Sequence, residues 1–177
     1  WNVVSSSWSG PQYHLPSTGN VPKLDAEMWI TLDQAHNLFK QSGLDLVEQQ
    51  KNALSKDFKP VPLDSKASVD IKNTIQESQS ANVIATIPGK KRPEEHVIYM
   101  AHWDHLGSRD GMEGDHIYNG AIDNATGTAG IISIAQAFKQ LPEAPDRSVT
   151  FVAVTAEEQG LLGSKYFAAN PTVPLTN

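Results

Sequence analysis

The residues of this chain best suited to chemistry are one histidine and four carboxylates: His102, Asp104, Asp123, Glu157 and Glu158. Carboxylates gathered at one place repel one another, which raises their pKa values. A divalent cation would remove this conflict, and two cations would remove it better. An imidazole nitrogen with carboxylate oxygens, and no thiolate, is a donor set typical of zinc, whereas calcium and magnesium prefer oxygen alone. The pattern therefore predicts a metal-assisted hydrolase.

Two apolar strands are predicted to bring these side chains together. The runs 96–101 and 148–155 are apolar, and the segment 128–141 between them has a helical pattern. Strand, helix and strand in this order predict a βαβ unit whose strands are parallel and covered on both faces. In an open α/β sheet, ligands bind beyond the carboxyl ends of the strands. His102 and the Glu157-Glu158 pair follow those ends.

The neighbouring segments complete the predicted fold class, which is α/β with a mixed β-sheet and helices on both faces. Alternating residues around Val69–Ile71 and Val83–Ile87 favour antiparallel strands joined to the parallel pair. A last helix is expected over 160–169. Thr31 and Asp45 are expected to cap two earlier helices, the first ending at Gly43 and the second at about Lys56.

Composition excludes several classes of protein. The 177 residues carry a formal net charge of −6, which argues against the basic face that a nucleic-acid partner needs. The absence of cysteine excludes disulfides, Cys-zinc sites and thiol nucleophiles. No apolar stretch approaches the roughly 20 residues of a membrane span. We expect a periplasmic or secreted location, although a cysteine-free chain also suits the cytosol.

The spacing of the acidic residues indicates what each could do. Asp104, two residues after His102, can accept the second imidazole N–H, which is the usual way of orienting a zinc histidine. The central position of Asp123 makes it a natural bridge between two metal ions. Glu157 and Glu158 point in different directions, so one would bind metal and the other would act as a general base. The spacing alone does not say which one does which.

Three motifs that contain these residues resemble the M28 family of co-catalytic zinc aminopeptidases. They are His102–Asp104, Gly120–Gly127 and Ala156–Ser164, and they occur in the family's order. The resemblance covers about 65–170 and implies a zinc-exopeptidase-like fold, two Zn²⁺ ions and a peptide substrate cleaved at its N-terminal bond.

By the same resemblance, each motif residue has an implied role. His102 and Glu158 would each bind one zinc ion and Asp123 would bridge both, while Glu157 would be the general base and Asp104 would support His102. The family often has a cis peptide bond after the bridging aspartate, here Asp123–Asn124. Residues 1–58 look like the tail of a protease-associated domain with a helical segment, and 59–177 like the N-terminal part of the peptidase domain.

The family pattern also requires an Asp and a His after the glutamate pair, and residues 159–177 contain neither. We therefore expect this chain to be a fragment that lacks its C-terminal metal ligands, binds zinc weakly and is inactive alone. Oligomeric state is left open. Two rivals remain: an M20-type zinc amidohydrolase or carboxypeptidase, which shares His-x-Asp and Glu-Glu, and a non-catalytic binding module on the same fold.

Overall fold

The computed structural model describes residues 10–16, 24, 26–109, 111 and 113–173. The chain divides into two compact units. One takes in Trp1–Pro11 and Ser17–Gln76, and the other takes in Gln12–Pro16 and Glu77–Asn177. This division falls after Gln76, whereas the sequence placed a domain boundary after residue 58. The relation of 1–58 to a protease-associated domain stays a prediction.

The first unit contains two short helices, α2 (Leu32–Gln41) and α3 (Leu46–Asn52). The Thr31 hydroxyl accepts a hydrogen bond at 3.3 Å from the main-chain N–H three residues later, and the Asp45 carboxylate accepts the equivalent bond at 2.8 Å. These bonds satisfy N–H groups that the first helical turn leaves unpaired. Both predicted helix starts are confirmed, although α3 ends before the expected Lys56.

The prediction of a strand around Val69–Ile71 is wrong. Residues 59–82 form neither helix nor strand, and Val69 and Ile71 are 46% and 56% exposed. Alternating apolar residues stabilise a strand only when a neighbouring strand pairs with it and a core covers one face. Among the described residues, no strand pairs with this segment.

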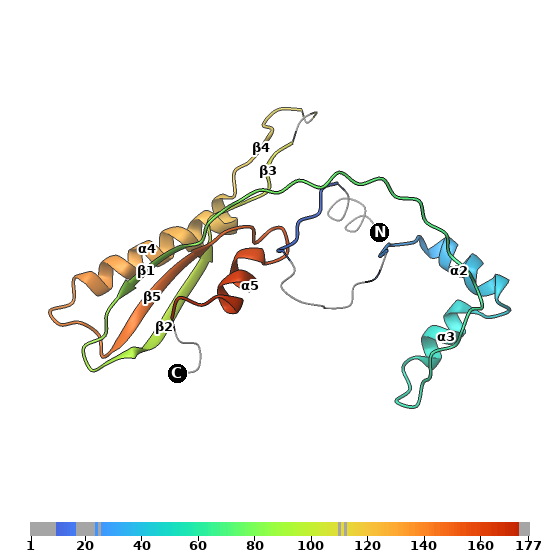
Figure 1. Ribbon diagram of the computed structural model, residues 1–177, viewed down its shortest axis with the longest axis horizontal. Helices are drawn as coiled ribbons and strands as arrows, with labels where there is room; N and C mark the ends of the chain where they lie inside the picture. The colour runs from blue at the N-terminus through green and yellow to red at the C-terminus, as the bar shows by residue number, and fades with distance from the viewer. Residues whose placement is uncertain (1–9, 17–23, 25, 110, 112, 174–177) are drawn as a thin grey trace. The chain divides into compact units, whose positions relative to one another are not determined.

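The second unit is built on a three-stranded sheet with the order β1–β5–β2. The strands are β1 (Val83–Ile87), β2 (Arg92–His102) and β5 (Arg147–Val154). The central strand β5 runs antiparallel to β1 and parallel to β2, which confirms the mixed sheet. Figure 1 shows β5 lying between the other two strands, with α4 across the sheet.

Helices cover both faces of this sheet. On one face, α4 (Thr126–Lys139) packs its buried Ile131 against a cluster that includes Phe151. On the other face, Phe167 of α5 (Leu162–Ala169) packs against Val152, which has no exposed surface. Burying each such side chain contributes roughly 1.5–3 kcal/mol. The predicted fold class is confirmed, and β2, α4 and β5 form the expected βαβ unit.

Two further features surround this core. Strands β3 (Gly107–Ser108) and β4 (Ile117–Tyr118) pair antiparallel between β2 and α4, in a stretch where we expected only a loop.

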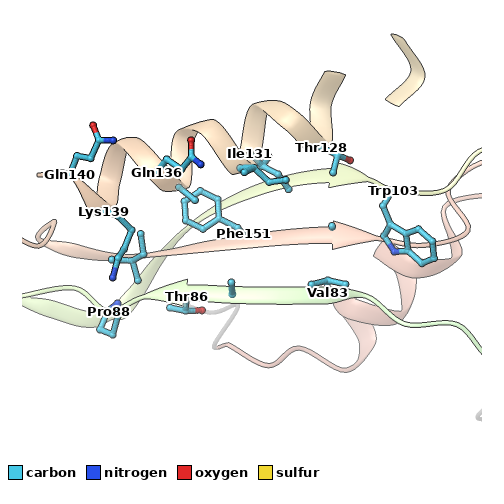
Figure 2. A pocket seen from close by; sticks show the side chains of 15 residues that line it. Val83, Thr86, Pro88, Trp103, Thr128, Ile131, Gln136, Lys139, Gln140 and Phe151 are labelled. Carbon is cyan, nitrogen blue, oxygen red and sulfur yellow. The ribbon is translucent and has the colours of Figure 1, made fainter. Parts of the chain in front are cut away.

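A groove of about 980 Å³ runs between α4 and β1. Figure 2 shows its walls, with Ile131 on the helix and Val83 and Thr86 on β1. None of the five predicted site residues lines it.

No helix among the described residues has both the length and the apolar character needed to cross a membrane.

Candidate metal centre

The parallel pairing of β2 and β5 brings the predicted site residues to one edge of the sheet. His102, the last residue of β2, lies in register with Val154, the last residue of β5. The segments that follow the two strands therefore leave the sheet together. The start of α4 is tied to the same edge, because the Thr128 hydroxyl donates a hydrogen bond of 2.9 Å to the His102 carbonyl. Asp123 lies just before α4, in the segment Ala121–Ala125.

The imidazole of His102 is buried and meets oxygen atoms on both sides. Its Nε2 lies 2.9 Å from Asp123 Oδ1 and 3.6 Å from Glu157 Oε2. Its Nδ1 lies 3.0 Å from the main-chain oxygen of Asp104. Burial alone would lower the pKa of His102, but the hydrogen bonds to Asp104 and Asp123 and the charge of Glu157 raise the pKa above its usual value.

The contacts of Asp104 differ from the expected ones. Its carboxylate lies 3.8 Å from His102 Nδ1, which is too long for a hydrogen bond, so the main-chain carbonyl is the imidazole's acceptor. The carboxylate instead accepts the main-chain N–H of Glu157, at 3.1 Å and 3.0 Å for its two oxygens. Asp104 thus holds both the histidine and the start of the glutamate pair. Its catalytic role stays a prediction.

The loop between Thr155 and Gly163 carries Glu157 and Glu158 and is called the glutamate loop below. It has an unusual backbone. Ala156 and Leu161 have φ angles of +50° and +63°, a region that residues with a Cβ rarely adopt. Such conformations cost of order 1–3 kcal/mol each and persist only where surrounding contacts hold them. Here the Glu157 carbonyl accepts two hydrogen bonds from the far side of the loop, at 2.9 Å from Gly160 N and 2.8 Å from Leu161 N.

Asn82 closes the base of this loop. Its side-chain amide donates to the Gly163 carbonyl at 2.8 Å, and its side-chain oxygen accepts the Thr155 N–H at 3.1 Å. The main chain adds a bond of 2.9 Å from Gly163 N to Thr155 O. The approach is so close that a Cβ on Gly163 would lie 2.2 Å from the Thr155 oxygen. Glycine is therefore required at position 163.

The site has the donors of a metal centre. One ligand atom each from His102, Glu157 and Glu158 lies within 4.8 Å of the others, and Asp123 contacts His102. Among the described residues, the ion pairs of these carboxylates and of Asp104 involve histidines only, with no lysine or arginine. Nitrogen and oxygen donors with this excess of negative charge fit zinc.

The structure thus brings all five predicted site residues to one edge, together with two residues that sequence reasoning did not place in the site. One of the two is His105, whose Nδ1 lies 2.6 Å from Glu158 Oε1. Asn82 was not singled out, because an asparagine before a strand carries no recognisable pattern. The expected cis peptide bond between Asp123 and Asn124 is present.

A mixed α/β sheet with histidine and acidic side chains at the shared end of two parallel strands is an arrangement typical of metal-dependent hydrolases. Comparison with known proteins agrees, since residues 82–177 match the model of Peptidase family M28. The chain belongs to this family.

Individual relatives carry related names. Aminopeptidase NAALADL1 of Rattus norvegicus is 32% identical over 110 residues, which is 60% of this chain and 13% of that protein. A probable zinc metalloprotease of Pyricularia oryzae is 35% identical over 88 residues, which is 50% of this chain and 17% of that protein. The crystal structure of a Peptidase M28 precursor from Shewanella amazonensis SB2B is 39% identical, with a TM-score of 0.42, and the match covers 50% of this chain and 18% of that one. The chain therefore spans less than a fifth of each of these relatives.

Proposed function

We propose that this chain contributes the first metal ligands and the general base of a zinc-dependent aminopeptidase with two zinc ions in its complete site. The observation that carries the proposal is the group of donor atoms from His102, Glu157 and Glu158 within 4.8 Å at the edge of the sheet. The family match and the relatives named aminopeptidase and zinc metalloprotease support the same reaction class.

Three side chains would hold the metal. His102 offers Nε2, because its Nδ1 faces the Asp104 carbonyl. Asp123 would bridge the two ions, since its carboxylate lies beside that nitrogen and is 68% exposed. Glu158 would bind the second ion. Zinc held there would act as a Lewis acid toward the scissile carbonyl of the peptide.

Glu157 would act as the general base. Its carboxylate lies 3.6 Å from His102 Nε2, and its side chain is 31% exposed, so a water molecule can reach it. It would accept a proton from the attacking water and later give that proton to the leaving amine. Asp104 orients this group by accepting the Glu157 main-chain N–H through both carboxylate oxygens.

A cavity of about 320 Å³ adjoins the site and offers a place for part of the substrate. Asp104 and His105 line it, together with Asn124 and the exposed indole of Trp103. The Trp103 Nε1–H donates to the Ala81 carbonyl at 3.2 Å, so the ring is held in place although it is exposed. A rigid aromatic surface in a cavity that also carries a few polar groups suits the side chain and amine of a peptide terminus.

The proposal is tested on the complete gene product with aminoacyl anilides as substrates. We expect zinc-dependent hydrolysis, and we expect Glu157→Gln to lower kcat by about 10²- to 10⁴-fold because general-base catalysis is lost. Glu143→Gln, an exposed glutamate paired with Lys90, is the matched control and should leave kcat unchanged. Hydrolysis of N-acyl amino acids instead of anilides would contradict the aminopeptidase assignment.

The binding-module rival makes the opposite prediction. If the complete gene product contained no zinc by elemental analysis, and Glu157→Gln changed no measured property, the enzymatic proposal would fail. The 177-residue chain alone should bind zinc weakly and lack activity, because only His102, Asp123 and Glu158 would contribute ligands. A tight two-site isotherm in zinc calorimetry on this chain would contradict that expectation.

A further inference from the structure

One histidine of the site, His105, makes contacts that the roles proposed for the metal ligands and the general base do not explain. His105 Nδ1 lies 2.6 Å from Glu158 Oε1, and the two side chains are only 22% and 17% exposed. A carboxylate can only accept hydrogen bonds, so Nδ1 must be the donor. Short charge-assisted bonds of this kind fix geometry as well as contribute energy.

The ring of His105 is itself held in place from two directions. Tyr118 of β4 meets it edge-on, with ring centroids 6.4 Å apart and an interplanar angle of 72°. Gly120 lies against its other side, where a Cβ would come within 2.9 Å of His105 Cγ. The short hairpin β3–β4 and the following glycine therefore fix the position of the ring before any ligand binds.

We propose that His105 is a positioning residue whose Nδ1–H holds one oxygen of Glu158 and thereby presents this carboxylate to zinc. The proposal rests on the proposed function in so far as it assigns Glu158 to the metal. It also gives the β3–β4 hairpin a purpose, because the hairpin supports a side chain that acts on the neighbouring glutamate loop. His105 is not assigned any contact with the metal, and its proposed role is confined to the position of Glu158.

The test compares two substitutions of nearly equal size in the 177-residue chain. His105→Asn keeps an N–H donor near the place of Nδ1, whereas His105→Leu fills similar space without a donor. Zinc affinity is measured by competition with a chromophoric chelator. Outer partners of metal ligands typically change metal affinity by 10- to 100-fold, so we expect about that loss for His105→Leu and a clear recovery for His105→Asn.

His116 provides the matched control, because it is an exposed histidine of the same glycine-rich stretch, and its Nδ1 lies 3.4 Å from the Arg109 carbonyl rather than beside a proposed metal ligand. His116→Leu should leave zinc affinity unchanged. Equal affinity of the parent chain and His105→Leu would overturn the proposal. A His105→Asn variant as weak as His105→Leu would also overturn it, since the ring would then act only by filling space.

A second measurement does not depend on zinc. Long-range ¹H–¹⁵N NMR of the parent chain at alkaline pH reports which ring nitrogen carries the proton. We expect the Nδ1–H tautomer at His105, and an Nε2–H tautomer would overturn the proposal. If the parent chain bound no zinc at all, the proposed function would lose support, while the tautomer would still decide whether His105 holds Glu158.

Discussion

The two ends of the central sheet both carry acidic side chains, but these side chains have different partners. At the end where β2 and β5 begin, the acids pair with lysine and arginine, in the ion pairs Lys90–Glu143, Lys91–Asp146, Arg92–Glu95 and Arg147–Glu95. At the end where these strands finish, the ion pairs of the acids within the described part of the chain are with histidines only. We call these the paired end and the histidine end.

The difference separates charges that complete the fold from charges that need a ligand. Exposed ion pairs with lysine or arginine contribute little free energy of unfolding, typically about 0–1 kcal/mol, yet they leave the local charge balanced. At the histidine end, the described residues include four carboxylates (Asp104, Asp123, Glu157 and Glu158) against two imidazoles (His102 and His105), so the negative charge is not balanced. The histidine end therefore attracts cations, whereas the paired end does not.

The largest expected effect comes from removing an acid at the histidine end. Glu158→Gln should lower the zinc affinity of the chain by at least the roughly 100-fold that loss of an outer contact can cause, because a direct donor is lost. Glu143→Gln at the paired end should leave affinity unchanged. Chelator competition measures both variants, and equal zinc affinities would contradict the division between the two ends.

The next effect tests the tight base of the glutamate loop. Gly163→Ala should destabilise the chain by about 1–3 kcal/mol and weaken zinc binding, because its Cβ would meet the Thr155 oxygen. Gly130 in the middle of α4 has open space around it, so Gly130→Ala should stabilise by about 0.5–1 kcal/mol. Urea unfolding followed by circular dichroism measures both. A Gly163→Ala variant as stable as the parent would show that the loop can relax.

A third comparison uses two side chains that each bridge two main-chain groups. Asn82 joins Thr155 and Gly163 at the histidine end, and Ser148 joins Gly89 N and Pro93 O at the paired end. Net contributions of about 0.5–1.5 kcal/mol per hydrogen bond predict losses of about 1–3 kcal/mol for Asn82→Ala and Ser148→Ala.

Only Asn82→Ala should also weaken zinc binding, because only its loop carries proposed ligands. Stability is read from urea unfolding and affinity from chelator competition. If Ser148→Ala reduced zinc affinity as much as Asn82→Ala did, the loss would reflect general destabilisation of the sheet.

The smallest effect concerns pH dependence at the paired end. The hydrogen bond from Arg147, helped by the charges of Arg147 and Arg92, lowers the pKa of Glu95. A lowered folded-state pKa adds stability above the unfolded pKa, and this stability is lost as the pH falls through the folded pKa. Glu95→Gln should therefore lower Tm slightly at neutral pH and not at all near pH 2. A Tm difference that persisted in acid would exclude this linkage.

Local signals predicted much of the fold. The caps at Thr31 and Asp45 act within three residues of themselves, so the sequence reveals them directly. The apolar runs of β2 and β5 are equally local, and His102 and the glutamate pair follow them at once. The strand expected near Val69 failed because pairing needs a distant partner that a local alternation cannot reveal.

Distant contacts limited the prediction of the site in the same way. The Asn82 amide reaches Gly163 and His105 reaches Glu158 across long separations in the chain, and neither pair leaves a periodic pattern. Asp104 contacts the His102 imidazole through its main-chain carbonyl and the Glu157 N–H through its carboxylate. Which of these groups faces which partner depends on the direction of the backbone at the end of β2. Residue types and spacing predicted that Asp104, His102 and Glu157 belong to the site, but they could not predict which atoms make each contact.

The position of Asn82 sets a limit on how far this chain can be trimmed. The residue lies immediately before β1, and the family match begins at it. A shortened protein that started with Val83 would keep every strand of the sheet. It would lose the side-chain amide that joins Thr155 and Gly163, the two ends of the glutamate loop. Such a protein could fold and still bind metal poorly, so anyone preparing a minimal version should retain at least one residue more than the strands require.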